Sequence, residues 1–79
     1  MTDLRSQILE CLERVSIHLS AGHDDDAPLP LDSMAVLNLH NELEIAFDLR
    51  LPAREVLPEN FASVRALMDW LGPKVGAAP

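Results

Sequence analysis

The 79 residues of this chain have the length of one small domain, and thirteen acidic against six basic residues give it a formal net charge of −7. Hydrophobic residues make up 48 %, which excludes an intrinsically disordered chain. Only 4 % are aromatic, so the core must be largely aliphatic, which suits packed helices better than a β-sandwich. The acidity argues against nucleic-acid binding, which needs clustered Lys and Arg. It either keeps a small protein soluble or attracts basic patches on other proteins.

The first predicted helix begins at Thr2-Asp3, where a capping residue and an acid fall together, and it ends near Ala21-Gly22. Its apolar positions step by three and four, as on one face of an amphipathic helix. They are Leu4, Ile8, Cys11, Leu12, Val15 and Leu19. Cys11 is the single cysteine, so no disulfide forms within the chain. We expect it to be a small buried residue, because nothing nearby supplies the base or the positive charge that a nucleophilic thiol needs.

Residues 22–31 form an irregular connection, because two prolines and three consecutive acids interrupt any helix here. The acids Asp24, Asp25 and Asp26 have two interpretations. They could bind a cation, but the segment lacks the spaced acids, the glycine and the distal Glu of a calcium loop. We therefore expect a solvated charged loop, pinned to the helices by Leu29.

The second predicted helix begins at about Ser33 and has two apolar faces. The inward face consists of Val36, Leu39, Leu43, Ala46 and Phe47. The neighbouring face consists of Met34, Leu37, Asn38, Asn41, Glu44 and Ile45. This second face carries more apolar surface than a solvated face needs. Leu37 and Ile45 either pack on another helix or contact a partner, and the sequence leaves both open; for Met34, next to Ser33, we expect partner contact.

Two more helices are predicted after this one. A short third helix covers Ala53–Leu57, preceded by Pro52 and ended by Pro58. The last helix is capped by Asn60 or Ser63, runs to about Leu71 and stops at Gly72-Pro73. Its inward positions are Val64, Leu67, Met68 and Leu71, with Trp70 at their edge. The sequence thus predicts an all-α protein, a small four-helix bundle of three longer helices and one short third helix. We expect a single domain over 1–75 and a flexible tail over 76–79.

Catalytic and membrane-spanning patterns are absent from the sequence. The histidines His18, His23 and His40 stand in no metal-binding or triad motif, and there is no glycine-rich phosphate loop. His40 is most simply a polar residue on the outer side of the second helix. No signal peptide or long apolar run is present, so we expect a cytoplasmic protein that does not bind membranes. The missing catalytic motifs lead us to expect that it is not an enzyme, and the acidity that it does not bind nucleic acid.

Ser33 has two interpretations. A serine at the start of a helix commonly caps it, since its oxygen accepts hydrogen bonds from unpaired N–H groups, and Asp32 would be favoured there by the helix dipole. A serine that follows an irregular loop is also accessible to modification, and a helix N-terminus favours an added phosphate. The residues 32–34 alone favour the capping interpretation, and the irregular loop before them adds the second.

Asp32-Ser33-Met34 resembles the Asp-Ser-Leu signature of acyl carrier proteins. The resemblance continues without a gap through Leu39, Leu43, Glu44 and the pair Phe47-Asp48, then through Leu51-Pro52, the short third helix and Val64 to Leu71. It covers roughly the last two thirds of the ordered chain, whereas the first helix matches only in pattern.

The resemblance implies that Ser33 receives 4′-phosphopantetheine from coenzyme A through a separate Mg²⁺-dependent phosphopantetheinyl transferase. The terminal thiol would then carry acyl or aminoacyl groups as thioesters, loaded by a ligase and used by downstream synthases or transferases. The protein would be monomeric when free. Basic partner patches would dock on the second helix. The residues proposed for docking are Asp32, Met34, Leu37, Asn38, Asn41 and Glu44.

Three departures from the family pattern bear on the pathway. Leu31 stands where the family usually has Gly, and the first loop uses Leu29 and Pro30 in place of its usual aromatic-acid-leucine anchor. The start of the second helix also has fewer acidic residues than in fatty-acid carriers, because Ala35, Asn38 and Asn41 stand in place of charged residues. The first two differences concern the geometry of the loop, whereas the third argues against a fatty-acid role and fits a specialised pathway (polyketide, nonribosomal peptide or aminoacyl transfer). The alternatives are a fatty-acid carrier or an unmodified helical interaction module with the same fold.

Overall fold

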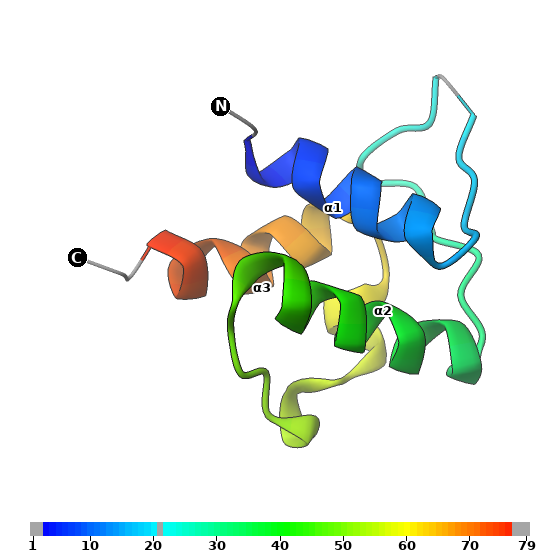
Figure 1. Ribbon diagram of the computed structural model, residues 1–79. Helices are drawn as coiled ribbons and strands as arrows, with labels where there is room; N and C mark the ends of the chain where they lie inside the picture. Colours follow the sequence, from blue (N-terminus) through cyan, green and yellow to red (C-terminus); the bar gives the residue numbers. More distant parts are fainter. Residues whose placement is uncertain (1–2, 21, 77–79) are drawn as a thin grey trace.

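The computed structural model describes residues 3–20 and 22–76, the last of these by its backbone alone. Three α-helices and two short 3₁₀ turns make up the regular structure of this part, in which no strand occurs (Figure 1). The elements are α1 (Leu4–Arg14), α2 (Ser33–Phe47), η1 (Ala53–Glu55), η2 (Pro58–Phe61) and α3 (Val64–Gly76). The all-α prediction is confirmed. The predicted short third helix is replaced by η1 and η2, because Val56 and Leu57 leave helical geometry before Pro58, which begins η2 and lacks the N–H that would continue a helix.

Helix α1 starts where the sequence predicts and ends earlier. The carboxylate of Asp3 accepts a hydrogen bond from the Ser6 N–H at 2.8 Å, which caps the helix. At the other end Ser16 takes a left-handed conformation with φ 66°. The Ile17 N–H then donates to the Leu12 carbonyl at 2.9 Å, in the pattern of a Schellman cap. The predicted end near Ala21-Gly22 is therefore wrong.

A turn at Val15 and Ser16 and a non-helical segment over residues 17–20 replace the last predicted turns of that helix. Val15, Ile17 and Leu19 are half-buried and pack against the core, whereas the polar residues between them are exposed. This is the two-residue alternation of extended chain, and it is already visible in the sequence. Val15 and Leu19 fit helical spacing as well, which explains the wrong prediction.

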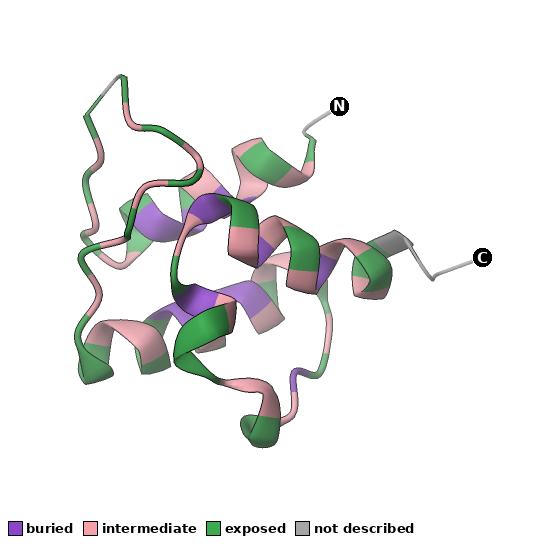
Figure 2. Cartoon of the chain, turned by 180° about the vertical axis from the view of Figure 1, so that it is seen from behind, coloured by how far each residue is buried: buried purple, intermediate pink, exposed green. Residues whose placement is uncertain are grey.

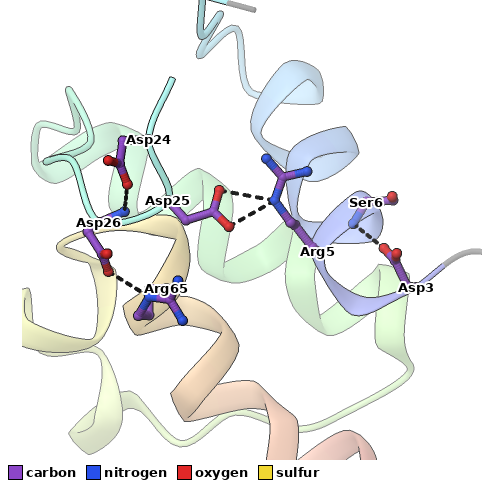
Figure 3. A network of polar contacts seen from close by, with 7 residues as sticks. All are labelled: Asp3, Arg5, Ser6, Asp24, Asp25, Asp26 and Arg65. Carbon is purple, nitrogen blue, oxygen red and sulfur yellow. Dashed lines mark hydrogen bonds and ion pairs between the residues drawn. The ribbon is translucent and has the colours of Figure 1, made fainter. Parts of the chain in front are cut away.

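The acidic loop is tied to both neighbouring helices (Figure 3). Both carboxylate oxygens of Asp25 lie within 3.0 Å of the Arg5 Nε in α1, and a carboxylate oxygen of Asp26 lies 2.6 Å from the Arg65 Nε in α3. The Asp24 carboxylate accepts the N–H of Asp26 at 2.9 Å and so shapes the turn. The loop is charged and exposed at Asp24 and Asp26, as predicted, but the ion pairs of Asp25 and Asp26 were not predicted. In the described part of the chain no group of three or more His, Cys, Asp or Glu side chains could hold a metal ion.

The core lies where α1 packs on both α2 and α3, while η2 packs on α3 (Figure 2). Its buried members are Ile8, Cys11, Leu12, Leu39, Leu43, Leu51, Phe61, Val64, Leu67 and Leu71. Cys11 is fully buried, as predicted, and this burial raises the pKa of its thiol. The core is aliphatic except for Phe61, whose ring lies 5.2 Å from that of Trp70.

Helix α3 begins at the predicted serine and runs further than predicted. The Ser63 hydroxyl accepts the N–H of Ala66 at 3.1 Å, so Ser63 is the cap. The helix continues through Pro73 to Gly76, which makes the predicted stop at Gly72-Pro73 wrong. An ion pair of 2.7 Å between Lys74 and Glu55 of η1 holds this last turn. Of the predicted tail 76–79, residues 77–79 lie outside the described residues.

None of the helices in the described residues is both long enough and apolar enough to cross a membrane.

Candidate functional site

The beginning of α2 divides two roles between neighbouring residues. Asp32 has extended backbone, and its Oδ1 accepts the N–H of Ala35 at 2.8 Å. The Asp32 carbonyl also accepts the N–H of Val36 at 2.9 Å, the first backbone bond of the helix. Asp32 is therefore the cap, and Ser33 is the first helical residue. The interpretation of Ser33 as the capping residue is wrong.

The Ser33 side chain lies at the surface. Its hydroxyl has no hydrogen-bond partner among the described residues. The carboxylate of Asp32 already occupies the capping position, so the hydroxyl is not needed to complete the helix end. An exposed hydroxyl at a helix N-terminus is accessible to an enzyme and tolerates an added phosphodiester.

An apolar groove of about 620 Å³ opens beside Ser33. The loop before α2 forms one wall, the first turns of α2 form the floor, and the segment from Val56 to Ala62 forms the other wall. Leu31, the residue that departs from the family pattern, lines this groove together with Val36, Leu37, Leu57 and Phe61. The Leu29 N–H donates to the Ala62 carbonyl at 3.0 Å and joins the two walls. The groove can hold an aliphatic chain or an apolar side chain next to the Ser33 hydroxyl.

The outer face of α2 is apolar and uncovered. Met34 is 65 % exposed, Leu37 59 % and Ile45 68 %. Asn38 and Asn41 are exposed on the same face. Of the two interpretations of Leu37 and Ile45, packing against another helix of the bundle is therefore wrong. Exposed apolar side chains gathered on one helix face, here with the uncharged Asn38 and Asn41 among them, are typical of a protein contact site.

Glu44 and His40 hold the chain that follows α2. A Glu44 carboxylate oxygen accepts the Leu51 N–H at 2.8 Å, and the His40 Nε2 donates to the Leu51 carbonyl at 2.8 Å. Leu51 is thereby fixed in the core, where it is 2 % exposed. The prediction that His40 lies on the outer side of the helix is wrong. His40 and Glu44 are four residues apart and therefore lie on one face of the helix, as the sequence already shows. Their shared contact with Leu51 could not be predicted from that spacing.

One comparison with curated proteins adds to this geometry. The chain is 40 % identical over 47 residues to aminoacyl carrier protein 2 of Bradyrhizobium diazoefficiens. The resemblance to acyl carrier proteins is confirmed. The matched segment is 60 % of this chain and 53 % of that relative, so it spans about half the length of the relative. No family model matches the chain, and no solved structure matches it.

Proposed function

We propose that this protein is a carrier protein that holds acyl or aminoacyl groups on 4′-phosphopantetheine attached to Ser33. The observation that carries the proposal is the division of roles at the start of α2. Asp32 caps the helix through a 2.8 Å hydrogen bond to Ala35, and this leaves the exposed Ser33 hydroxyl for modification. The similarity to an aminoacyl carrier protein supports the same role.

Attachment needs little from the chain beyond an accessible hydroxyl. Ser33 Oγ forms a phosphodiester with the pantetheine phosphate of coenzyme A and loses its proton, while adenosine 3′,5′-bisphosphate leaves. A phosphopantetheinyl transferase with Mg²⁺ supplies the catalysis. The unpaired N–H groups at the start of α2 favour the phosphodiester charge. When bound, the group supplies a thiol that carries its cargo as a thioester, and the protein itself is a substrate and shuttle.

The cargo that we propose is an aminoacyl group, because the similar protein is named an aminoacyl carrier protein. The partners are then the transferase, an aminoacyl-loading ligase and a downstream transferase or synthase. We place their docking on the exposed surface around Ser33. The docking residues are Asp32, Met34, Leu37, Asn38, Asn41 and Glu44. The Glu44 carboxylate also holds the Leu51 N–H, so it contributes to this surface from its rim.

Intact-mass measurement tests the proposal. Incubation with coenzyme A, Mg²⁺ and a broad-specificity phosphopantetheinyl transferase should add the mass of one phosphopantetheine. Ser33→Ala should abolish the gain, and Ser20→Ala, which removes another exposed hydroxyl, should keep it. If the transferase modifies another carrier protein under the same conditions but leaves this one unchanged, the chain is an unmodified helical interaction module instead.

A further inference from the structure

The exposed face of α2 lacks charge along most of its length. From Ser33 to Asn41 the sequence contains no Asp, Glu, Lys or Arg. The exposed residues of this face recur every three or four positions and therefore lie along one line of the helix. We call this set the docking stripe: Met34, Leu37, Asn38, Asn41 and Ile45. It runs from the residue next to Ser33 almost to the end of the helix, about 18 Å at 1.5 Å per residue.

The acidic side chains around the stripe are engaged within the protein. The Asp32 carboxylate caps α2, and the Glu44 carboxylate holds the Leu51 N–H. A Glu42 oxygen lies 3.9 Å from the Arg14 Nη1 of α1. At the far end Glu44, Asp48 and Arg50, two acids and one base, line one shallow depression together with Asn41 and Ile45. From Met34 to Asn41, however, the stripe carries none of the net charge of −7.

The groove beside Ser33 extends the same apolar surface. Leu37 belongs to the docking stripe and also lines the groove, together with Leu31 and Leu57. Ser33 lies at the junction, because it begins α2 and lines the groove as well. A protein that reaches the Ser33 hydroxyl therefore meets aliphatic side chains on both sides of it.

We infer that the enzymes that act at Ser33 dock on this surface through an apolar, uncharged surface of their own, with an aliphatic side chain seated in the groove. Charge complementarity selects this partner, since a basic patch would meet no carboxylate on the stripe between Ser33 and Asn41. The inference rests on the proposed function and names its partner chemistry. It also adds Ile45 to the docking residues, and it assigns Glu44 only a small part of the binding free energy.

Kinetics of Ser33 modification test the inference. The probe is a broad-specificity phosphopantetheinyl transferase at saturating coenzyme A, and the readout is kcat/KM for the carrier. Leu37→Ser and Ile45→Ser should each lower this value by about tenfold, as expected for truncated anchors at an interface centre. The matched control is Val75→Ser, which removes the same kind of exposed apolar side chain from α3 and should change the value by less than about twofold.

Ionic strength supplies a second readout. For the unmodified sequence, kcat/KM should change by less than about threefold between about 50 and 500 mM salt, because apolar docking is not screened. A larger fall, or stripe variants that behave like Val75→Ser, would overturn the inference. Circular dichroism verifies that each variant is folded. Complete absence of modification contradicts the proposed function, whereas modification that ignores the stripe contradicts this inference alone.

Discussion

At the scale of single residues, Asp32 and Ser33 divide two tasks between them: either could cap the helix, but only Ser33 has a hydroxyl to present. Both residue types cap helices well, and here the acid takes the position because its backbone is extended while that of Ser33 is already helical. For the proposed attachment at Ser33, the consequence is that the neighbouring carboxylate, and not the serine oxygen, accepts the helix N–H.

This division predicts that two adjacent substitutions differ in their effect on stability. Asp32→Ala should lower the free energy of unfolding by about 1 kcal/mol, the usual cost of losing a capping side chain. Ser33→Ala should change it by less than about 0.5 kcal/mol, because the Ser33 hydroxyl holds no helix N–H. Urea denaturation followed by far-UV circular dichroism measures both.

Asp32→Asn is the matched control, since an amide oxygen still accepts the Ala35 N–H and should keep most of the stability. A loss of stability in Ser33→Ala as large as that in Asp32→Ala would show that the serine, not the acid, caps α2.

The sequence was enough to predict that Asp32 and Ser33 lie at the candidate site, but not how the site is arranged around them. The motif at 32–34 places both residues at a helix start, and the sequence contains nothing that decides which of two good caps is used. The groove was not predictable either. It is assembled from residues 28–37 and 56–62, which come together only through tertiary contacts.

At the scale of elements, the helix interiors and the helix starts follow the sequence, whereas the C-terminal ends of α1 and α3 do not. The C-terminal ends of α1 and α2 rest on local contacts. Ser16 and Asp48 take left-handed conformations, with φ 66° and 53°, although neither is a glycine. Beyond Asp48 the Leu49 N–H donates to the Glu44 carbonyl, which completes the same kind of cap as at Ser16. A search for glycine caps therefore misses both ends.

The extension of α3 past Pro73 depends on a contact from a distant element. Glu55 of η1 pairs with Lys74 at 2.7 Å and accepts the Trp70 Nε1–H at 2.9 Å. The hydrogen bond from Lys74, followed by that from Trp70, holds the pKa of the Glu55 carboxyl below its usual range. One carboxylate thus joins η1 to the last two turns of α3.

An acid titration followed by the fluorescence of Trp70, the single tryptophan, tests this junction between the Glu55 carboxylate and α3. Because the pKa of Glu55 is lowered in the folded state, its contribution to stability is present above the ordinary glutamate pKa and is lost as pH falls through the lowered value. Trp70 fluorescence should therefore change at a pH below the ordinary glutamate range. Glu55→Gln should lack this transition. A midpoint at or above the ordinary value, or an unchanged titration in Glu55→Gln, would contradict the junction.

At the scale of the whole molecule, the long connection between α1 and α2 is held by charge as well as by apolar packing (Figure 3). Asp25 pairs with α1 and Asp26 with α3, and the Arg65 N–H donates to the Asp25 carbonyl at 2.9 Å. This connection carries one wall of the groove beside Ser33. The ion pairs of Asp25 and Asp26 therefore help to shape the proposed site, because they hold the connection that lines the groove.

The three consecutive acids allow a matched test of this link. Asp24→Asn and Asp25→Asn remove the same charge from adjacent positions, but only Asp25 has an ion-pair partner in the structure, and Asn at 24 can still accept the Asp26 N–H. Asp25→Asn should lower the melting temperature and speed hydrogen exchange at the Leu29 amide. Asp24→Asn should leave both close to their original values.

The difference between these two variants should also depend on pH and salt. Arg5 holds the pKa of the Asp25 carboxyl below its usual range, so the stabilising effect of the pair is present above the ordinary aspartate pKa and is lost as pH falls through the lowered value. The two variants should thus converge at about pH 2 and approach one another in high salt, which screens exposed charges. Equal melting temperatures at neutral pH and low salt would mean that apolar contacts alone, Leu29 and Leu31 among them, keep the loop in place.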